Sequence, residues 1–536
     1  MSAVPERTFL SRLSWRTVNR HRQPVIWCLA LLIGTAVGYA IMAFRLLIDF
    51  ITSLTFGGDE TRLLIRVAEL PGWQIVAVTT LGGLVVGLVI KAILPELRAG
   101  GVADIIEARA IRSGAMPLGY GLKSALVSAL SIGAGASVGR EGPAAHLGAT
   151  VGSSIAQALG YSPAITRTLL GAGVAAAVAA SFNAPIAGVL FALEVVLGHY
   201  ALRAFGPIVI SSVAASVVTR LHFSDNPAFL LPRYEIVSFW EMPAFALLGA
   251  VSAVAAVLFM RSIMAADMWS QKISMPFVLR PALAGFAVGL IALVYPEVLG
   301  VGYGATVNAL STNYTLTVLL GCVAAKIVAT AISLAGRFGG GVFSPSLFIG
   351  AFVGSAFGIL ASAAFPTLSS AEGAYALVGM GAVAAATLGA PISTTLIVFE
   401  LVQDYRLSIA LLIAASIATV LTQSMLGRSF FHWQIERRGF HISEGPQKVL
   451  LETMKISDLM TEGTAPTRDE DGKQLPVLFA HDTLERAFAL FEQTGATVLP
   501  VAERTDRDTV LGVLAHERAL EKFSKALIEA NIEEHR

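Results

Sequence analysis

Apolar runs separated by short polar stretches make up most of the first 440 residues. They cover residues 25–44, 73–94, 118–132, 144–159, 169–197, 204–218, 242–265, 281–295, 316–335, 342–365, 376–402 and 407–425. Many are shorter than the roughly 20 residues that a straight membrane-spanning helix needs, or are interrupted by Gly and Pro. Interrupted helices occur inside membranes where the irregular backbone lines a cavity. The pattern therefore predicts an all-α polytopic membrane protein with tilted and broken helices, as in a transporter or a channel.

Composition and charge agree with a membrane protein. Charged residues make up 14% of the 536-residue chain and hydrophobic residues 55%, whereas charged residues are about 25% of a typical soluble protein. The formal net charge of +1 gives no argument for binding nucleic acid. Cys28 and Cys322 both lie in apolar runs, so we expect neither a disulfide framework nor a metal site. Residues 1–24 carry five arginines directly before the first run, which predicts an uncleaved first span with its basic flank in the cytoplasm.

Two segments about 200 residues apart indicate an internal repeat. Residues 171–194 and 379–400 share Gly-x-Gly, Ala-Pro-Ile and a glutamate nine positions after the proline, and their prolines are 206 residues apart (391 − 185). Pro143 and Pro345, in two glycine-rich motifs, are 202 apart (345 − 143). Two matches in nearly the same register predict two related halves. If the halves are inverted, their glycine-rich helix starts meet near the middle of the membrane and face one ion.

The most unusual stretch is Ser-Val-Gly-Arg-Glu-Gly-Pro at 137–143, a charged group inside an apolar region. A carboxylate and a guanidinium at membrane depth are costly, so they are expected to face a cavity or a partner. Pro143 suits the first turn of a helix, and glycines leave backbone N–H groups uncovered at its positive end. This arrangement favours an anion site with the Glu141 carboxylate in the anion's place. The alternative is an Arg140–Glu141 pair that only fixes two helices.

These motifs resemble those of the CLC family of anion channels and proton-coupled anion exchangers. The resemblance is carried by Gly-Arg-Glu-Gly-Pro at 139–143, Gly-Gly-Val-Phe-Ser-Pro at 340–345 and the paired Ala-Pro segments, and it covers roughly residues 20–439. It implies a homodimer with one pathway per subunit for small inorganic anions, chloride above all. It also implies two inverted halves, about 25–222 and 242–438, and cytoplasmic termini. We expect a transport protein and not an enzyme.

The resemblance also assigns residues. Glu141 corresponds to the gating glutamate, whose carboxylate competes with the anion and moves aside or is protonated to let it pass. Val342 and Phe343 correspond to residues whose backbone N–H groups bind the central anion. The anion-binding or pore residues that it implies are Gly100, Gly101, Gly139, Arg140, Gly142, Gly341, Val342, Phe343 and Phe431.

Two hydroxyl ligands of the family are missing. The family's Gly-Ser-Gly-Ile-Pro-Glu motif corresponds to Ala-Gly-Gly-Val-Ala-Asp at 99–104, so the serine is replaced by Gly100, or by Gly101 if the register slips by one. The inner tyrosine corresponds to Phe431. We therefore expect backbone N–H groups and helix ends to hold the anion, with space at Gly100 for water or a larger anion. Selectivity among chloride, nitrate and bicarbonate stays open.

A further departure concerns protons. Proton-coupled members usually carry two successive glutamates after the first Ala-Pro segment, and the second collects protons from the cytoplasm. Here Glu194 is followed by Val195, which cannot carry a proton. This favours a passive, voltage- or pH-gated channel, with a proton-coupled anion antiporter as the alternative. A hypothesis from another class is a membrane-anchored sensor that uses the C-terminal tail.

Two cations in apolar stretches of the sequence need partners. We expect Arg140 to pair with Asp104 or Glu107 as a structural brace. Lys326 lies in an apolar run, where an ammonium needs a partner or a wet cavity, and a structural role is favoured.

Three other polar residues are interpreted structurally. Glu194 and Glu400 stand at equivalent positions of the two repeats, so we expect them to hold helix ends or carbonyl partners. His146, close to a helix start, is expected to be packed or to line the pore.

The composition changes abruptly near residue 440. We interpret 439–452 as a linker and 453–536 as a single CBS-like domain, with strands near 475–478, 497–501 and 510–514 and helices near 483–491 and 519–530. Such domains usually pair and can enclose an adenine nucleotide, so a pair here would need the partner subunit. No other cofactor is expected. The compact loops and short tail suggest a bacterial inner membrane.

Overall fold

The computed structural model describes residues 22–223, 236–311, 313–440, 447, 450–451, 454–461, 463, 476–503 and 506–535. The predicted N-terminal basic segment, apart from residues 22–24, and most of the predicted linker lie outside the described residues. Helices account for nearly all of the structure up to residue 440, and eight of those in the described part are long and apolar enough to cross a membrane. The predicted all-α polytopic architecture is confirmed.

The first half contains nine helices within the described residues. They are α1 (Arg22–Phe56), α2 (Leu63–Glu69), α3 (Gly72–Ile93), α4 (Val102–Ile111), α5 (Leu118–Gly133), α6 (Glu141–Ala158), α7 (Pro163–Phe182), α8 (Pro185–Phe191), which continues as a π-helical turn over Ala192–Leu197, and α9 (Leu202–Phe223). A short 3₁₀ turn, η3 (Glu60–Arg62), precedes α2.

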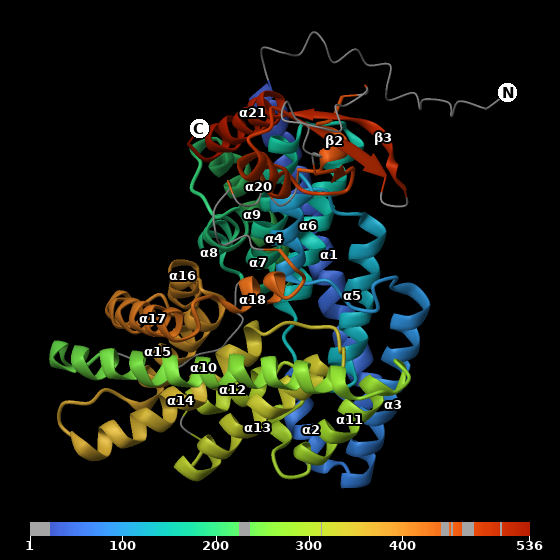
Figure 1. The fold of residues 1–536 in the computed structure, drawn as a ribbon. Coiled ribbons are helices and arrows are strands. Elements are labelled where there is room, and N and C mark those ends of the chain that lie inside the picture. Colours follow the sequence, from blue (N-terminus) through green and yellow to red (C-terminus); the bar gives the residue numbers. More distant parts are fainter. Residues whose placement is uncertain are drawn as a thin grey trace.

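The second half repeats this arrangement. Its helices are α10 (Met242–Lys272), α11 (Leu279–Ala292), α12 (Tyr303–Leu310), α13 (Leu316–Ala335), α14 (Phe343–Ala364), α15 (Glu372–Leu388), α16 (Pro391–Val402), α17 (Tyr405–Leu426) and α18 (Phe430–Glu436). In Figure 1, α10 to α15 and α17 lie below α4 and α6 to α9, and α3 runs beside α11 across the two halves.

Two long apolar runs are broken at equivalent places. The run 169–197 breaks at Asn183, which ends α7 in the left-handed region (φ 56°), and the run 376–402 breaks at Gly389 (φ 69°). In each repeat a proline begins the next helix two residues later. A left-handed residue ends a helix, and the residue before a proline avoids the helical region. The short helices α4, α12 and α18 have no long apolar run, so hydropathy did not reveal them.

Glycine contacts are the same in the two repeats. A Cβ on Gly148 of α6 would lie 2.3 Å from the carbonyl oxygen of Gly173 in α7, and a Cβ on Gly350 of α14 would lie 2.3 Å from that of Gly379 in α15. Small residues let helix backbones approach closely inside a membrane. The helix that begins at each glycine-rich motif is therefore held against the next helix by the same kind of contact.

The tail forms a small αβ unit with its own core. Strands β1 (Leu478–Phe479), β2 (Val498–Glu503) and β3 (Asp506–Ala515) form a sheet in that order, β1 parallel and β3 antiparallel to β2. Helices α20 (Leu484–Thr494) and α21 (His516–His535) accompany it. Its core includes Leu478, Phe491 and Leu514. The predicted small αβ fold is confirmed, and its assignment as a CBS domain stays a prediction.

Candidate functional site

The two glycine-rich motifs meet through their backbones. The N–H of Gly139 donates to the carbonyl of Gly341 at 2.7 Å, and the N–H of Gly341 donates to the carbonyl of Gly139 at 2.8 Å. The predicted convergence of the two helix starts is confirmed. Because these two N–H groups bond to each other, they are not free to bind an anion in this arrangement.

The crossing leaves little room for side chains. A Cβ on Gly139 would lie 3.0 Å from the backbone nitrogen of Ser344, and a Cβ on Gly341 would lie 3.3 Å from the Cα of Gly142. At Gly340 an added Cβ would meet the side chain of Val138 at 2.3 Å. The lack of side chains therefore allows α6 and α14 to begin side by side.

Glu141 lies between these helix starts. It is the first residue of α6 and is 3% exposed. The hydroxyl of Ser344, near the start of α14, donates to its Oε2, and the hydroxyl of Tyr303 donates to its Oε1 at 2.5 Å. The first N–H groups of a helix lack partners within it and carry partial positive charge. The carboxylate thus occupies a position that suits an anion.

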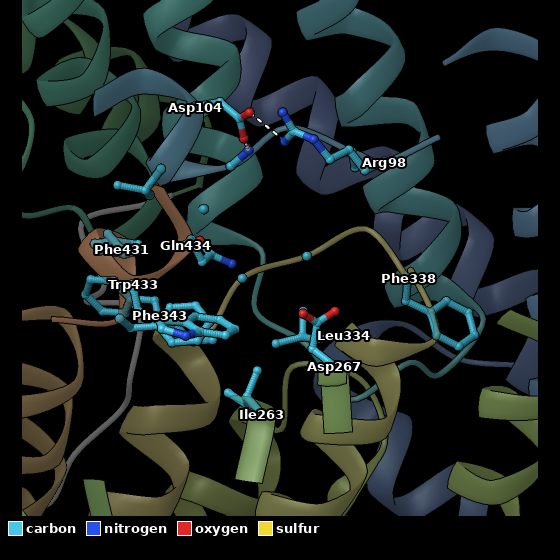
Figure 2. Close-up of a pocket in the computed structure, with 18 of the residues that line it drawn as sticks. Arg98, Asp104, Ile263, Asp267, Leu334, Phe338, Phe343, Phe431, Trp433 and Gln434 are labelled. Atoms are coloured by element: carbon cyan, nitrogen blue, oxygen red, sulfur yellow. Dashed lines mark hydrogen bonds and ion pairs between the residues drawn. The ribbon is translucent and has the colours of Figure 1, made fainter. Parts of the chain in front are cut away.

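A cavity of about 310 Å³ opens beside Glu141. Sequence-predicted residues that line it are Gly101, Glu141, Gly142, Gly341, Val342, Phe343 and Phe431. In Figure 2, Phe343, Phe431 and Trp433 gather on one side of the cavity and Phe338 lies on the other. Its walls thus combine two helix starts with aromatic rings. Four of the predicted residues are not among the described residues that line the cavity: Gly100, Gly139, Arg140 and Val195. Val195 packs against the hydrophobic core instead.

The space at Gly100 is filled. A Cβ on Gly100 would lie 2.3 Å from Nε2 of His146, so the imidazole occupies the position of a side chain at residue 100. His146 is 1% exposed, and within the described chain neither ring nitrogen has a hydrogen-bond partner. Its ring lies edge-on to Tyr120, with centroids 5.7 Å apart. The expected space for water or a larger anion is therefore taken by a packed histidine.

Arg140 does not pair with Asp104 or Glu107, so that prediction is wrong. Its Nη1 lies 2.7 Å from Oε2 of Glu60, and its guanidinium lies over the ring of Tyr303 at 4.6 Å from the centroid. Glu60 belongs to η3, which the loop after α1 brings to this face, and it is 6% exposed. Arg140 is therefore a structural brace, as expected, but toward η3 instead of α4.

The two acids of α4 bind other arginines. Asp104 lies 2.6 Å from Arg98 and 3.0 Å from Arg438, and Glu107 lies 2.7 Å from Arg438. Figure 2 shows Asp104 and Arg98 joined in this way. Asp104 also accepts from the N–H of Gly101 at 2.8 Å, which closes the start of α4. Burial favours a higher pKa for the Asp104 carboxyl, but Arg438 and Arg98 outweigh it and hold that pKa below its ordinary value.

The duplicated glutamates hold helix ends, as predicted, but each holds a helix of the other half. Glu194 accepts from two N–H groups at the start of α16, at 3.1 and 2.7 Å. Glu400 accepts from two N–H groups at the start of α8, at 3.0 and 2.7 Å. Carboxylates at helix N-termini satisfy unpaired donors. The two repeats are therefore linked by a symmetric pair of caps.

Lys326 has carbonyl partners, which agrees with the structural role predicted for it. Its Nζ donates to the carbonyls of Val298 at 3.0 Å and Gly300 at 3.1 Å, and the side chain is fully buried.

Three residues near Glu141 were not found from the sequence: Ser344, Tyr303 and Glu60. Ser344 stands inside a recognised motif, but nothing in the motif indicated that its hydroxyl contacts Glu141. Tyr303 begins the short helix α12 and Glu60 belongs to the 3₁₀ turn η3, and neither element carries a motif. Their roles depend on contacts across 162 and 80 residues of chain, which a local pattern cannot reveal.

Comparison with known proteins gives a consistent result. The family model described as "Voltage gated chloride channel" matches residues 82–423. A ClcB-like protein of Ralstonia nicotianae, named as a chloride channel protein, is 34% identical over 390 residues, which are 72% of this chain and 90% of that protein. The H(+)/Cl(-) exchange transporter ClcA of Vibrio cholerae serotype O1 is 32% identical over 314 residues, which are 57% of this chain and 67% of that protein. The crystal structure of a slow cyanobacterial Cl-/H+ antiporter matches with a TM-score of 0.68 and 22% identity, over 77% of this chain and 97% of that chain.

Proposed function

Because this chain belongs to the voltage gated chloride channel family, we propose that it exchanges chloride or a similar small anion for protons, with Glu141 as the gate. It is an integral membrane protein of a family that transports anions. The proton coupling, the choice of anion and the residue roles are our proposal.

The observation that carries the proposal is the position of the Glu141 carboxylate. It lies at the meeting point of two helix starts, beside the cavity, with one hydroxyl donor on each oxygen. An anion that enters the cavity competes for the same positive helix ends. A proton on Glu141 removes its charge and weakens its hold on the site. Anion entry and proton binding thus both displace one carboxylate, which is the requirement for coupling them.

The central anion would be held by the backbone at the start of α14. We assign this to the N–H groups of Val342 and Phe343, with Gly142 and Gly101 in the wall and the ring of Phe431 in place of a hydroxyl. These residues line the same cavity. Such a site has no side-chain hydroxyl of residue 100 or 431 to distinguish among small anions.

Exchange is favoured over the passive channel that we expected from Val195. The Vibrio cholerae relative is named an H(+)/Cl(-) exchange transporter. Val195, which packs against the core, is the specific observation in favour of passive conduction, because valine carries no proton. Passive conduction is therefore retained as the second candidate.

The reversal potential of purified protein in liposomes separates the two candidates. A chloride gradient is imposed with and without an opposing pH gradient. Proton-coupled exchange predicts that the reversal potential shifts with the pH gradient. A reversal potential that follows chloride alone would establish passive conduction.

Replacing Glu141 with Gln tests the gate. The amide cannot bind a proton or carry the competing charge, so chloride flux should persist and lose its dependence on pH between about 4 and 8, the range that spans ordinary carboxyl titration. Flux is measured in liposomes at a fixed chloride gradient. Unchanged pH dependence would contradict the assignment of Glu141.

We further propose a homodimer with both termini in the cytoplasm, in a bacterial inner membrane. A pair of CBS-like tails across the dimer would then be available for an adenine nucleotide. Light scattering of the full chain in detergent tests the dimer, and a thermal shift on addition of ATP tests the nucleotide site. A monomeric mass, or no shift at millimolar ATP, would count against these two points respectively.

A further inference from the structure

Tyr303 contacts the gate from outside the anion cavity. It is the first residue of α12, and its hydroxyl donates to Oε1 of Glu141 at 2.5 Å. Glu141 is one of the described residues that line the cavity, whereas Tyr303 is not. Its hydroxyl therefore reaches the gate carboxylate but does not line the anion site. The hydroxyl is therefore placed to influence transport through its bond to Glu141.

The tyrosine is fixed by a charged layer behind it. The guanidinium of Arg140 lies over its ring at 4.6 Å from the centroid, and Glu60 holds Arg140 at 2.7 Å. A guanidinium on an aromatic face and a buried ion pair both restrict movement of the ring. Gly302, in the left-handed region at φ 88°, sets the turn that places Tyr303 at the start of α12. The hydroxyl is therefore preorganised toward Glu141.

Other charged groups act on the same layer. Arg45 and Asp49 of α1 interact electrostatically with Glu60, and Arg45 also does so with Arg140. Lys326 of α13 interacts electrostatically with Glu60 as well. These groups belong to the fixed surroundings of the gate. A change confined to the tyrosine hydroxyl leaves all of them in place.

We propose that Tyr303 is a positioning residue that holds the charged Glu141 carboxylate in the pathway and thereby sets the anion concentration needed to displace it. A hydrogen bond from a hydroxyl to a carboxylate stabilises the charged form in that position. Anion binding and protonation must both overcome this bond before the gate opens. The inference rests on the proposed function of Glu141 as gate and adds the group that determines how firmly the gate closes.

Ser344 has a different role from Tyr303. Its hydroxyl donates to Oε2 of Glu141 and comes from α14, directly after Phe343 in the anion site. Changing Ser344 therefore disturbs the anion site and the gate together. Changing the hydroxyl of Tyr303 removes its bond to Glu141 and leaves the backbone of the anion site unchanged, which makes it the informative substitution.

The test is Tyr303→Phe, which removes one oxygen and keeps the ring under Arg140. Chloride flux into liposomes is measured against chloride concentration and against pH. We expect the half-saturating chloride concentration to fall about ten-fold with the maximal rate retained, the effect expected for losing one hydrogen bond to a charged group. We also expect acid to activate flux at higher pH than in the unmodified protein, because the charged gate has lost a donor.

Tyr375→Phe is the matched control. Tyr375 is buried, and its hydroxyl, like that of Tyr303, donates to a buried carboxylate, here Glu241 at 2.8 Å. It lies in α15, away from the cavity lining. This variant should lose thermal stability as Tyr303→Phe does and keep the chloride and pH dependence of the unmodified protein. If the two variants behave alike, Tyr303 has only a structural role and the proposal is wrong.

A double substitution separates this proposal from the proposed function itself. In the Glu141→Gln background there is no charged gate, so adding Tyr303→Phe should change neither the chloride dependence nor the pH dependence. An equal shift in both backgrounds would show that Tyr303 acts elsewhere and would overturn the inference while leaving the gate assignment intact. If instead the unmodified protein carries no anion flux, the proposed function itself fails, before any variant is compared.

Discussion

At the scale of single residues, the site depends on what surrounds one carboxylate and one glycine. Glu141 has a hydroxyl donor on each oxygen, so its charge is stabilised in a buried position. Gly100 has no side chain because His146 occupies that space. The replacement of the family's serine by glycine is therefore matched by a neighbouring side chain.

This matching predicts the outcome of restoring the serine. Gly100→Ser places a Cβ 2.3 Å from Nε2 of His146, a separation that atoms do not adopt, so the imidazole or α4 must move. Forcing extra atoms into a packed core costs about 1–3 kcal/mol. We expect a lower melting temperature in detergent and reduced chloride flux. His146→Ala in the same chain should restore both, and a Gly100→Ser protein as stable as the original would contradict this account.

The residue scale is also where sequence reasoning was least complete. It identified Glu141, Val342 and Phe343, which do line one cavity. Glu141 stands out as a charge in an apolar region, and the other two belong to the second glycine-rich motif of the family resemblance. It did not identify the partner of Arg140, because Glu60 lies in a turn with no motif. Contacts between side chains from distant segments depend on the packed structure, and a pattern along the chain contains no information about them.

At the scale of elements, the helix starts organise the molecule. Glycines let α6 and α14 begin together, and the glutamates of the two repeats cap α16 and α8 in exchange. The broken runs, the repeat and the two converging helix starts were all predictable, because proline, glycine and length mark them locally. The short helices α4, α12 and α18 were not, because they have too few apolar residues to form a run.

The reciprocal caps give a paired prediction. Glu194→Gln and Glu400→Gln each replace one of two acceptor oxygens by an amide nitrogen, so one helix N–H loses its partner in each variant. Each should lower the free energy of unfolding by about 1 kcal/mol, as for other helix caps. Thermal unfolding in detergent measures this. Because the caps act on different helices, the loss in free energy of unfolding in the double variant should be about the sum of the losses in the two single variants. An unchanged melting temperature in either single variant would contradict the capping role.

At the scale of the whole molecule, the charged cluster of Arg98, Asp104, Glu107 and Arg438 joins α4 to the chain after α18. It therefore connects the first half of the membrane domain with the segment that leads to the tail. Its ion pairs are partly buried, so they are screened less by salt than surface pairs.

The lowered pKa of Asp104 makes this link sensitive to acid. A carboxyl with a folded-state pKa below its unfolded value adds stability above the unfolded pKa, which is about 3.9 for Asp, and loses it as pH falls through the folded value. Asp104→Asn should therefore lower the free energy of unfolding at pH 7. The expected loss is about 1.5–3 kcal/mol, which is the usual contribution of a hydrogen bond to a charged group. The difference from the unmodified protein should stay constant down to about pH 4 and shrink below it.

Unfolding at a series of pH values measures this difference. Glu69→Gln is the control, because Glu69 forms an exposed ion pair with Arg66 that is worth little. It should leave the melting temperature nearly unchanged at every pH. A difference between Asp104→Asn and the unmodified protein that persists undiminished in strong acid would contradict an electrostatic origin.

The backbone bridge between Gly139 and Gly341 has a consequence for how such a protein changes over time. Its two hydrogen bonds involve no side chain, so most substitutions elsewhere leave the junction of the two halves intact. The constraint around it is on the length of the two loops, because one inserted or deleted residue beside either glycine would shift one helix start against the other. Descendants of such a chain are expected to keep the spacing of these two short loops and the small residues at the crossing, while positions farther from the junction change in composition.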